Sequence, residues 1–154
     1  MSRIHLATGI AVRDRTVLLV ASAYPSQELP LWNLPGGRQQ PGELLPETLA
    51  REVREETGLE ASVADLAYVS ESYDGDTHIL NATFEMSVRG TLAIPKTGDH
   101  IVEAAWYALE DLGARLRVEV VRTPLLDYLR NGRRYGGFAW AGISVRWPDE
   151  SGNG

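Results

Sequence analysis

Three glutamates, Glu52, Glu55 and Glu56, lie close together in a chain of 154 residues. On a helix each residue turns by about 100°, so these side chains fall within an arc of roughly 100°. Carboxylates at this spacing repel one another in water. A hard divalent cation reverses that effect, because Mg²⁺ binds carboxylate oxygens and keeps waters that a phosphate can replace. The spacing therefore predicts a cation site, although Glu55 and Glu56 alone would indicate only a solvated helix.

The residues around these glutamates fit the same interpretation. Arg51 precedes Glu55 by one helical turn and can pair with it or orient a neighbouring carboxylate. Gly36 has no side chain, so its backbone carbonyl can reach the same ion. Glu43 lies in the loop before the helix. The sequence leaves open whether Glu43 binds the metal or only fixes the loop.

The stretch GGRQQPGELLPETLAREVREETGL carries a longer pattern. After Gly37, its specified residues are Glu43, Arg51-Glu52-Val53, Glu55-Glu56 and Gly58-Leu59. This spacing resembles the Nudix box and matches it at every specified position. The context also fits, since a strand and a glycine turn precede the helix and a glycine ends it. Two departures are Gln40, where many members of the family have glutamate, and the missing polar cap at Leu44-Leu45.

The resemblance implies a metal centre and a reaction. It implies Glu52, Glu55 and Glu56 as ligands of Mg²⁺, for which Mn²⁺ can substitute, with the Gly36 carbonyl as a further ligand and Arg51 as an orienting partner. The implied activity is hydrolysis of a phosphoanhydride bond in a nucleoside diphosphate linked to another group, releasing a nucleoside monophosphate. The cation would neutralise phosphate charge and activate the attacking water.

The sequence leaves open which residue acts as the general base. In the family it is a glutamate of the box, here Glu52 or Glu55, or a carboxylate from a later loop. Glu103 stands at the start of an expected strand and resembles that later acid. A solvated residue at a strand end is an equally open interpretation. His100 lies nearby, but a histidine in a loop is more often simply solvated.

Four residues next to the motif are candidates for substrate binding: Trp32, Asn33, Gly37 and Arg38. Gly37 and Arg38 stand where the backbone and a guanidinium can contact phosphate, although a solvated arginine is equally open. Asn33 can bind the edge of a base, and Trp32 can stack on a ring, although a core tryptophan is the favoured interpretation. Asn33 beside Trp32 resembles family members that remove oxidised nucleoside triphosphates.

Hydrophobic periodicity and turn residues predict the elements that position these side chains. The expected elements are a hairpin over 4–13 and 16–24, a strand over 31–34 stopped by Pro35-Gly36-Gly37, a helix over 46–57, strands over 61–72, 77–88 and 104–109, a turn at 110–112, a helix over 118–130 and a docked strand after Asn131 that includes Phe138, Trp140, Ile143, Val145 and Trp147. We expect residues 1–147 to form one domain and 148–154 a disordered tail. The order predicts a mixed α/β domain, and the resemblance implies the Nudix α/β/α sandwich.

Composition narrows the classes of partner. Hydrophobic residues make up 44% and charged residues 23%, an ordinary globular balance. The net charge of −6 argues against a nucleic-acid surface, whereas a small-molecule nucleotide can bind through divalent cations. The sequence has no cysteine, which excludes thiolate metal sites and cysteine nucleophiles. No apolar run is long enough for a membrane span, so we expect a cytoplasmic protein. A homodimer would be common for the family.

Two other classes of function are alternatives to nucleotide hydrolysis. The first is a non-catalytic Nudix-like domain that senses a nucleotide, and such domains usually lose the glutamates that this chain keeps. The second is a Nudix-fold isomerase of prenyl diphosphates, whose chemistry usually relies on a cysteine. The sequence therefore favours an enzyme, a nucleotide pyrophosphohydrolase.

Overall fold

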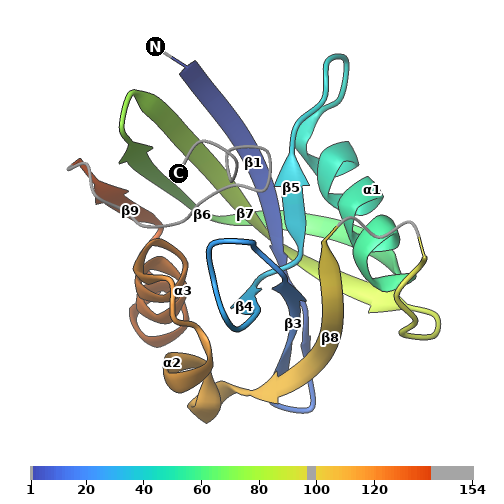
Figure 1. The fold of residues 1–154 in the computed structure, drawn as a ribbon. Coiled ribbons are helices and arrows are strands. Elements are labelled where there is room, and N and C mark those ends of the chain that lie inside the picture. Colours follow the sequence, from blue (N-terminus) through green and yellow to red (C-terminus); the bar gives the residue numbers. More distant parts are fainter. Residues whose placement is uncertain (1, 97–99, 140–154) are drawn as a thin grey trace.

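The computed structural model describes residues 2–96 and 100–139, and it has the mixed sheets and helices expected from the sequence (Figure 1). Along the chain the elements are β1 (Ser2–Ile10), β2 (Val12–Arg13), β3 (Thr16–Ser22), β4 (Leu31–Asn33), β5 (Gly36–Arg38), α1 (Leu45–Thr57), β6 (Glu60–Asp74), β7 (Thr77–Arg89), β8 (Ile101–Ala108), the 3₁₀ turn η1 (Leu109–Asp111), α2 (Leu112–Arg115), α3 (Glu119–Asn131) and β9 (Tyr135–Phe138).

The larger sheet has the order β5-β1-β7-β6-β9. Strands β6 and β7 form a long antiparallel hairpin, and β1 lies parallel to β7. The expected hairpin over 4–13 and 16–24 needs a correction, because β1 pairs with β5 and β7 and not with β3. Only the short β2 forms a hairpin with β3. The turn between them holds Asp14 and Arg15 at positive φ, as tight hairpin turns require.

The smaller sheet places β3 between β4 and β8, with β2 continuing beside β3. Two apolar cores lie on opposite sides of this framework. One joins α1 to the strands through Leu49, Val53 and Leu59, and the other joins the α2–α3 region to them through Leu112 and Leu125. Strands between two helical layers form the α/β/α sandwich that the resemblance implied. No helix among the described residues is both long and apolar enough to cross a membrane.

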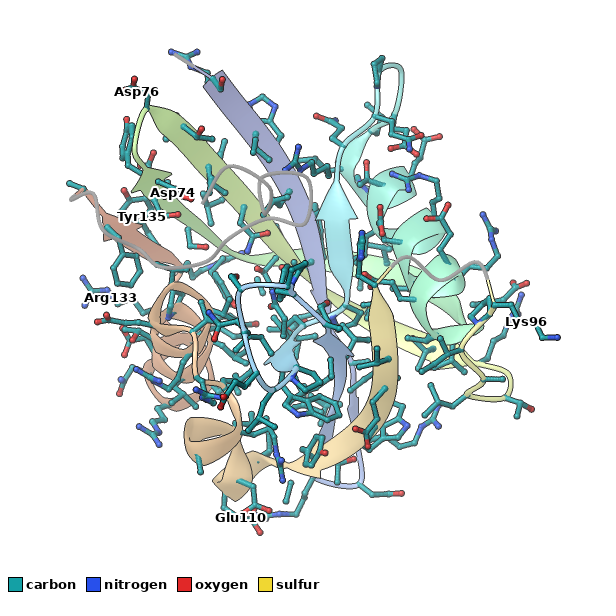
Figure 2. All side chains as sticks on the ribbon, in the orientation of Figure 1. Asp74, Asp76, Lys96, Glu110, Arg133 and Tyr135 are labelled. Carbon is teal, nitrogen blue, oxygen red and sulfur yellow. The ribbon has the colours of Figure 1, made fainter. Side chains whose placement is uncertain are left out.

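The chain after α3 only partly lies within the described residues. Strand β9 pairs in parallel with β6, from Val69 with Tyr135 to Ser72 with Phe138. Arg134 holds this connection in place by donating to the backbone carbonyls of Leu66 and Ala67. Figure 2 shows Tyr135 and Asp74 on one side of the molecule, and Lys96 on the other. The expected continuation through Trp140, Ile143, Val145 and Trp147, and the tail 148–154, lie outside the described residues.

Candidate active site

Helix α1 carries the three glutamates, and its boundaries follow from local sequence. Pro46 stands in its first turn, and the Glu47 carboxylate accepts a hydrogen bond from the Leu44 N–H, supplying the cap that the Leu44 side chain cannot. Gly58 ends the helix with a left-handed φ of 74°. Leu49 and Val53 are fully buried in the core. Burial of that face turns the carboxylates of the motif toward the glycine strand β5.

Two glycines of β5 make close contacts with the helix. The sequence predicted a turn there, but Gly36 and Gly37 form a strand that pairs with Thr8 and Ala7 of β1. A Cβ on Gly36 would lie 2.1 Å from the Ala7 carbonyl oxygen, so only glycine fits. A Cβ on Gly37 would lie 2.6 Å from the Glu52 carboxyl carbon. The strand therefore lies directly against the acidic face of α1.

Arg51 connects the acidic residues to one another. Its Nε donates to Glu43 Oε2 at 2.6 Å, and its Nη1 donates to Glu52 Oε1 at 2.8 Å and to Glu55 Oε2 at 3.3 Å. Its Nη2 also donates to the backbone carbonyl of Arg38, at 3.1 Å. One guanidinium thus contacts three carboxylates and the end of the glycine strand.

Glu43 fixes the loop before α1. Its carboxylate accepts hydrogen bonds from Arg51, from the Gln40 N–H and from the Thr48 hydroxyl. The Arg51 hydrogen bond is the main reason why the pKa of Glu43 falls from 4.5 to about 2. Of the two interpretations that the sequence left open, these contacts favour the structural one.

Glu52 and Glu56 lie in poorly solvated positions. Burial raises the pKa of Glu56 well above its usual value, and the nearby Glu52 and Glu55 raise it further. Glu56 Oε1 accepts a hydrogen bond from the Gly36 N–H at 2.9 Å, which partly opposes that shift. Burial also raises the pKa of Glu52, and Arg51 opposes it. Glu55 is more open, with 52% of its side chain exposed.

These residues fit a hard divalent cation. Glu52 and Glu56 are half-buried carboxylates with raised pKa values, and Arg51 is the one positive partner that the described residues give them. Carboxylate oxygens are the ligands that Mg²⁺ prefers. Within residues 2–96 and 100–139, no three acidic or histidine side chains already converge as a complete coordination shell. Glu52 and Glu55 instead turn toward Arg51, and Glu56 toward Gly36. Small side-chain rotations would therefore have to accompany binding of the ion.

A cleft opens beside the carboxylates. Its wider part, called here the acidic hollow, has a volume of about 550 Å³. The acidic hollow is lined by residues that include Gly36, Gly37, Arg38, Glu52, Glu56 and His100. A second part, the apolar hollow, includes Trp32, Tyr68, Val118, Val120 and Val121. Leu6, Thr8, Tyr24, Asn33 and Leu34 line both parts, so the two hollows form one cleft.

The four expected substrate-binding residues all line this cleft. Gly37 and Arg38 lie in the acidic hollow, Trp32 lies in the apolar hollow, and Asn33 lies in both. The Trp32 ring also packs edge-on against Tyr107, with ring centroids 4.9 Å apart, in agreement with a packing role. Asn33 Oδ1 accepts the Leu34 N–H at 2.7 Å, so part of its amide is already engaged by its own backbone.

The register of β8 turns Glu103 away from the cleft. Glu103 pairs with Ala21 of β3, and the next residues along β3 on either side, Val20 and Ser22, line the acidic hollow. Successive side chains of a strand point to opposite faces, so Ala21 and Glu103 face away from it. The register of β8 shifts between Ala21 and Ser22, a bulge that the sequence did not indicate. His100 lines the acidic hollow instead.

Sequence reasoning missed Tyr24 and the floor of the apolar hollow. Tyr24 lines both hollows, and burial raises its pKa, with a smaller rise from Glu56. The floor includes Thr8, Ser70, Ser72 and Asn81. These side chains come from three different strands, β1, β6 and β7, and Ser70 and Ser72 flank the polar Glu71, so no alternation of apolar and polar residues in the sequence marks them.

Comparison with known proteins agrees with this geometry. Residues 3–129 match the family model described as NUDIX domain. The chain is 34% identical over 106 residues to the ADP-ribose pyrophosphatase of Methanocaldococcus jannaschii, covering 68% of this chain and 61% of that protein. It is 37% identical over 87 residues to the 8-oxo-dGDP phosphatase of Homo sapiens, and the match covers 56% of this chain and 26% of that protein. It is also 37% identical over 65 residues to the CTP pyrophosphohydrolase of Escherichia coli, and that match covers 42% of this chain and 48% of the relative. The matched segments thus span less than two thirds of these relatives.

Solved structures share the fold. A NUDIX hydrolase from Nitrosomonas europaea matches with a TM-score of 0.72 and 25% identity, covering 86% of this chain and 93% of that one. The E. coli ORF135 protein matches with a TM-score of 0.71 and 22% identity, covering 84% and 93%. The family match spans both the glycine strand and the acidic helix. The chain therefore belongs to the NUDIX domain family.

Proposed function

We propose that the protein hydrolyses a phosphoanhydride bond of a nucleotide in the presence of Mg²⁺ and releases a nucleoside monophosphate. One observation carries the proposal: the acidic face of α1 and the glycine strand form one end of a cleft whose other end is apolar and aromatic. A nucleotide has the matching asymmetry, since its phosphates are anionic and its base is flat and largely apolar on its faces.

Glu52, Glu55 and Glu56 would hold the cation, with the Gly36 carbonyl as a further oxygen. When bound, Mg²⁺ would neutralise phosphate charge and make water easier to deprotonate. Arg51 keeps Glu52 and Glu55 in place by donating to both from one nitrogen. The Gly37 backbone and Arg38 line the acidic hollow, where they can approach phosphate oxygens.

Glu52 is the proposed general base. It lines the acidic hollow beside Gly37, so a carboxylate oxygen that the cation leaves free could accept the proton of the attacking water. The water oxygen would attack one phosphorus in line with the bridging oxygen, and its proton would pass to Glu52. The phosphorus–oxygen bond on the far side would break, and the departing phosphate would carry the negative charge. Glu103 faces away from the acidic hollow and is not placed in this role.

Nucleoside triphosphates and nucleoside diphosphates linked to sugars are the proposed substrate classes. The relatives named above are an ADP-ribose pyrophosphatase, an 8-oxo-dGDP phosphatase and a CTP pyrophosphohydrolase. The position of Asn33 where the two hollows meet supports a nucleotide whose base enters the apolar hollow. We therefore place the base in the apolar hollow and the phosphates in the acidic hollow.

The test is a substrate panel with purified protein. It should contain ATP, GTP, CTP, UTP, 8-oxo-dGTP and ADP-ribose, each incubated with Mg²⁺, with Mn²⁺ and with chelator alone. The expected result is release of a nucleoside monophosphate from at least one substrate, only when a divalent cation is present. Folded protein that binds the cation but cleaves none of these compounds would refute the proposal.

A further inference from the structure

The floor of the apolar hollow is one face of the larger sheet. Strand register places its residues in rows that cross β6, β7 and β1. One row is Tyr68–Thr83–Thr8, the next is Ser70–Asn81–Leu6, and the next is Ser72–Ile79–Ile4. Residues two apart on a strand face the same side, so the three rows share one face. Helix α1 packs against the opposite face, which includes Ala7 and Met86.

Two hydroxyls of this floor have no hydrogen-bond partner within residues 2–96 and 100–139. Ser70 and Ser72 are only 5% and 6% exposed, and both line the apolar hollow. Among the described residues, neither side chain makes a hydrogen bond. A buried hydroxyl without a partner destabilises a fold, so buried polar groups are normally paired. Both hydroxyls line the apolar hollow, so a molecule bound there can pair with them.

Asn81, between them and β1, is held in a fixed orientation. Its Oδ1 accepts from the Thr8 hydroxyl at 3.1 Å, and its Nδ2 donates to the Thr83 hydroxyl at 3.2 Å. Thr8 and Thr83 are themselves hydrogen-bonded at 2.8 Å, which closes a ring of three side chains. An amide has two donor hydrogens and two acceptor positions, so one of each is left. Asn81 lines the apolar hollow and can present them there.

We propose that Ser70, Ser72 and Asn81 determine base specificity by binding the edge of the nucleobase. This inference rests on the proposed function, because it takes the occupant of the cleft to be a nucleotide. The two serines stand roughly 6.6 Å apart along the strand. They and the amide can therefore contact several polar atoms of one flat ring. Asn81 can add one further contact, through the donor or the acceptor that the ring with Thr8 and Thr83 leaves unused.

The surroundings favour a base over a phosphate at this end. Ser70, Ser72 and Asn81 are neutral, and the walls include Trp32, Val118 and Val121. The charged residues that line the apolar hollow are Glu71 and Asp74, and carboxylates there would repel phosphate. Figure 2 shows Asp74 at the end of the long β6–β7 hairpin. Phosphate is better accommodated in the acidic hollow, where a cation and Arg38 can meet it.

Binding measurements without metal test this proposal separately from catalysis. The probes are AMP, GMP, CMP, UMP and 8-oxo-dGMP, with ribose 5-phosphate as a probe that lacks a base. The variants are Ser70→Ala, Ser72→Ala and both together. Ser62→Ala is the matched control, because Ser62 is exposed on the same strand. Melting temperatures of all variants are measured in the absence of nucleotide.

The wild type should bind at least one monophosphate more tightly than ribose 5-phosphate. The double variant should bind it about ten-fold or more weakly, since two hydrogen bonds are lost. The double variant should bind ribose 5-phosphate as the wild type does. The Ser62→Ala control should bind every probe as the wild type does. The melting temperature of the double variant should stay equal or rise, because neither deleted hydroxyl has a partner in the part of the chain that the structure describes.

Three results would overturn the inference. They are unchanged monophosphate binding by the double variant, equal weakening of ribose 5-phosphate binding, and a wild type that prefers no monophosphate to ribose 5-phosphate. A drop in melting temperature together with equal weakening of every probe would mean that the serines act structurally. Failure of the proposed hydrolysis is read from the substrate panel with Mg²⁺, so the two failures are distinguishable.

Discussion

The guanidinium of Arg51 binds the Glu43 carboxylate through two nitrogens, with Nε at 2.6 Å from Oε2 and Nη2 at 3.0 Å from Oε1. This forked contact ties the loop before α1 to the middle of the helix. The same guanidinium reaches Glu52 and Glu55. Loop geometry and the orientation of the proposed metal ligands are therefore set by one side chain, which makes Arg51 a positioning residue.

Replacing Arg51 by lysine should separate geometry from charge. Lysine keeps the positive charge but cannot form the forked contact. We expect Arg51→Lys to lower kcat/KM by at least ten-fold and to speed hydrogen exchange in the loop 39–44. Arg54→Lys, an exposed arginine on the same helix, is the control and should change neither. Normal loop protection in Arg51→Lys would show that the forked contact does not hold the loop.

The Glu43 contact should also appear as a pH-dependent stability. The folded protein lowers the pKa of Glu43 from 4.5 to about 2, so folding favours the charged form. Its stabilising effect is fully present above pH of about 4.5 and is lost as pH falls toward 2. Denaturant unfolding should therefore show wild type more stable than Glu43→Gln at neutral pH, with the difference shrinking over that interval. A difference independent of pH would exclude this origin.

The charged carboxylate of Glu56 should destabilise the folded protein until a cation is bound. Its half-buried carboxylate lies near Glu52 and Glu55, and burial raises its pKa. In chelator, Glu56→Gln should therefore melt at a higher temperature than wild type, by about 2–4 °C for each kcal/mol of relieved repulsion. Adding Mg²⁺ or Mn²⁺ should raise the wild-type melting temperature but not that of the variant, and turnover should fall by at least about 100-fold.

The exposed Glu60 gives the control for that experiment, because Glu60→Gln removes one negative charge outside the acidic face of α1. Glu60→Gln should respond to the cation as wild type does. If Glu56→Gln kept the full cation-dependent rise in melting temperature, Glu56 would not be a ligand.

The two glycines of β5 should respond differently to alanine. In Gly37→Ala the new Cβ would meet the Glu52 carboxyl group at 2.6 Å, and a flexible side-chain end can move away. We expect a near-normal melting temperature with at least a ten-fold loss of kcat/KM, since small misplacements of catalytic groups are costly. In Gly36→Ala the Cβ would meet backbone at 2.1 Å, so the fold itself should be destabilised. Gly113→Ala, whose nearest contact is 3.8 Å, should leave activity unchanged.

The sequence was informative where structure depends on neighbouring residues. Pro46 and Gly58 marked the ends of α1 closely, and the spacing of the glutamates placed them on one face of it. It was less informative where partners are distant. Pairing of β1 with β7 joins segments far apart in the chain, and Gly36 became a strand residue because β1 lies beside it. The unpaired hydroxyls of Ser70 and Ser72 depend on which strands flank them, so no local pattern could reveal them.

The bulge beside Glu103 also depends on pairing between segments that are distant in the chain. A shift in pairing between Ala21 and Ser22 changes which face Glu103 occupies, and only the three-dimensional register reveals it. Because Glu103 then faces away from the acidic hollow, Glu103→Gln should retain kcat within about three-fold. Glu52→Gln should lose about 10²- to 10⁴-fold, the usual contribution of a general base. Single-turnover rates across pH, with cation saturating for each variant, measure both. A large loss in Glu103→Gln with normal rates in Glu52→Gln would reverse the assignment and return the base to β8.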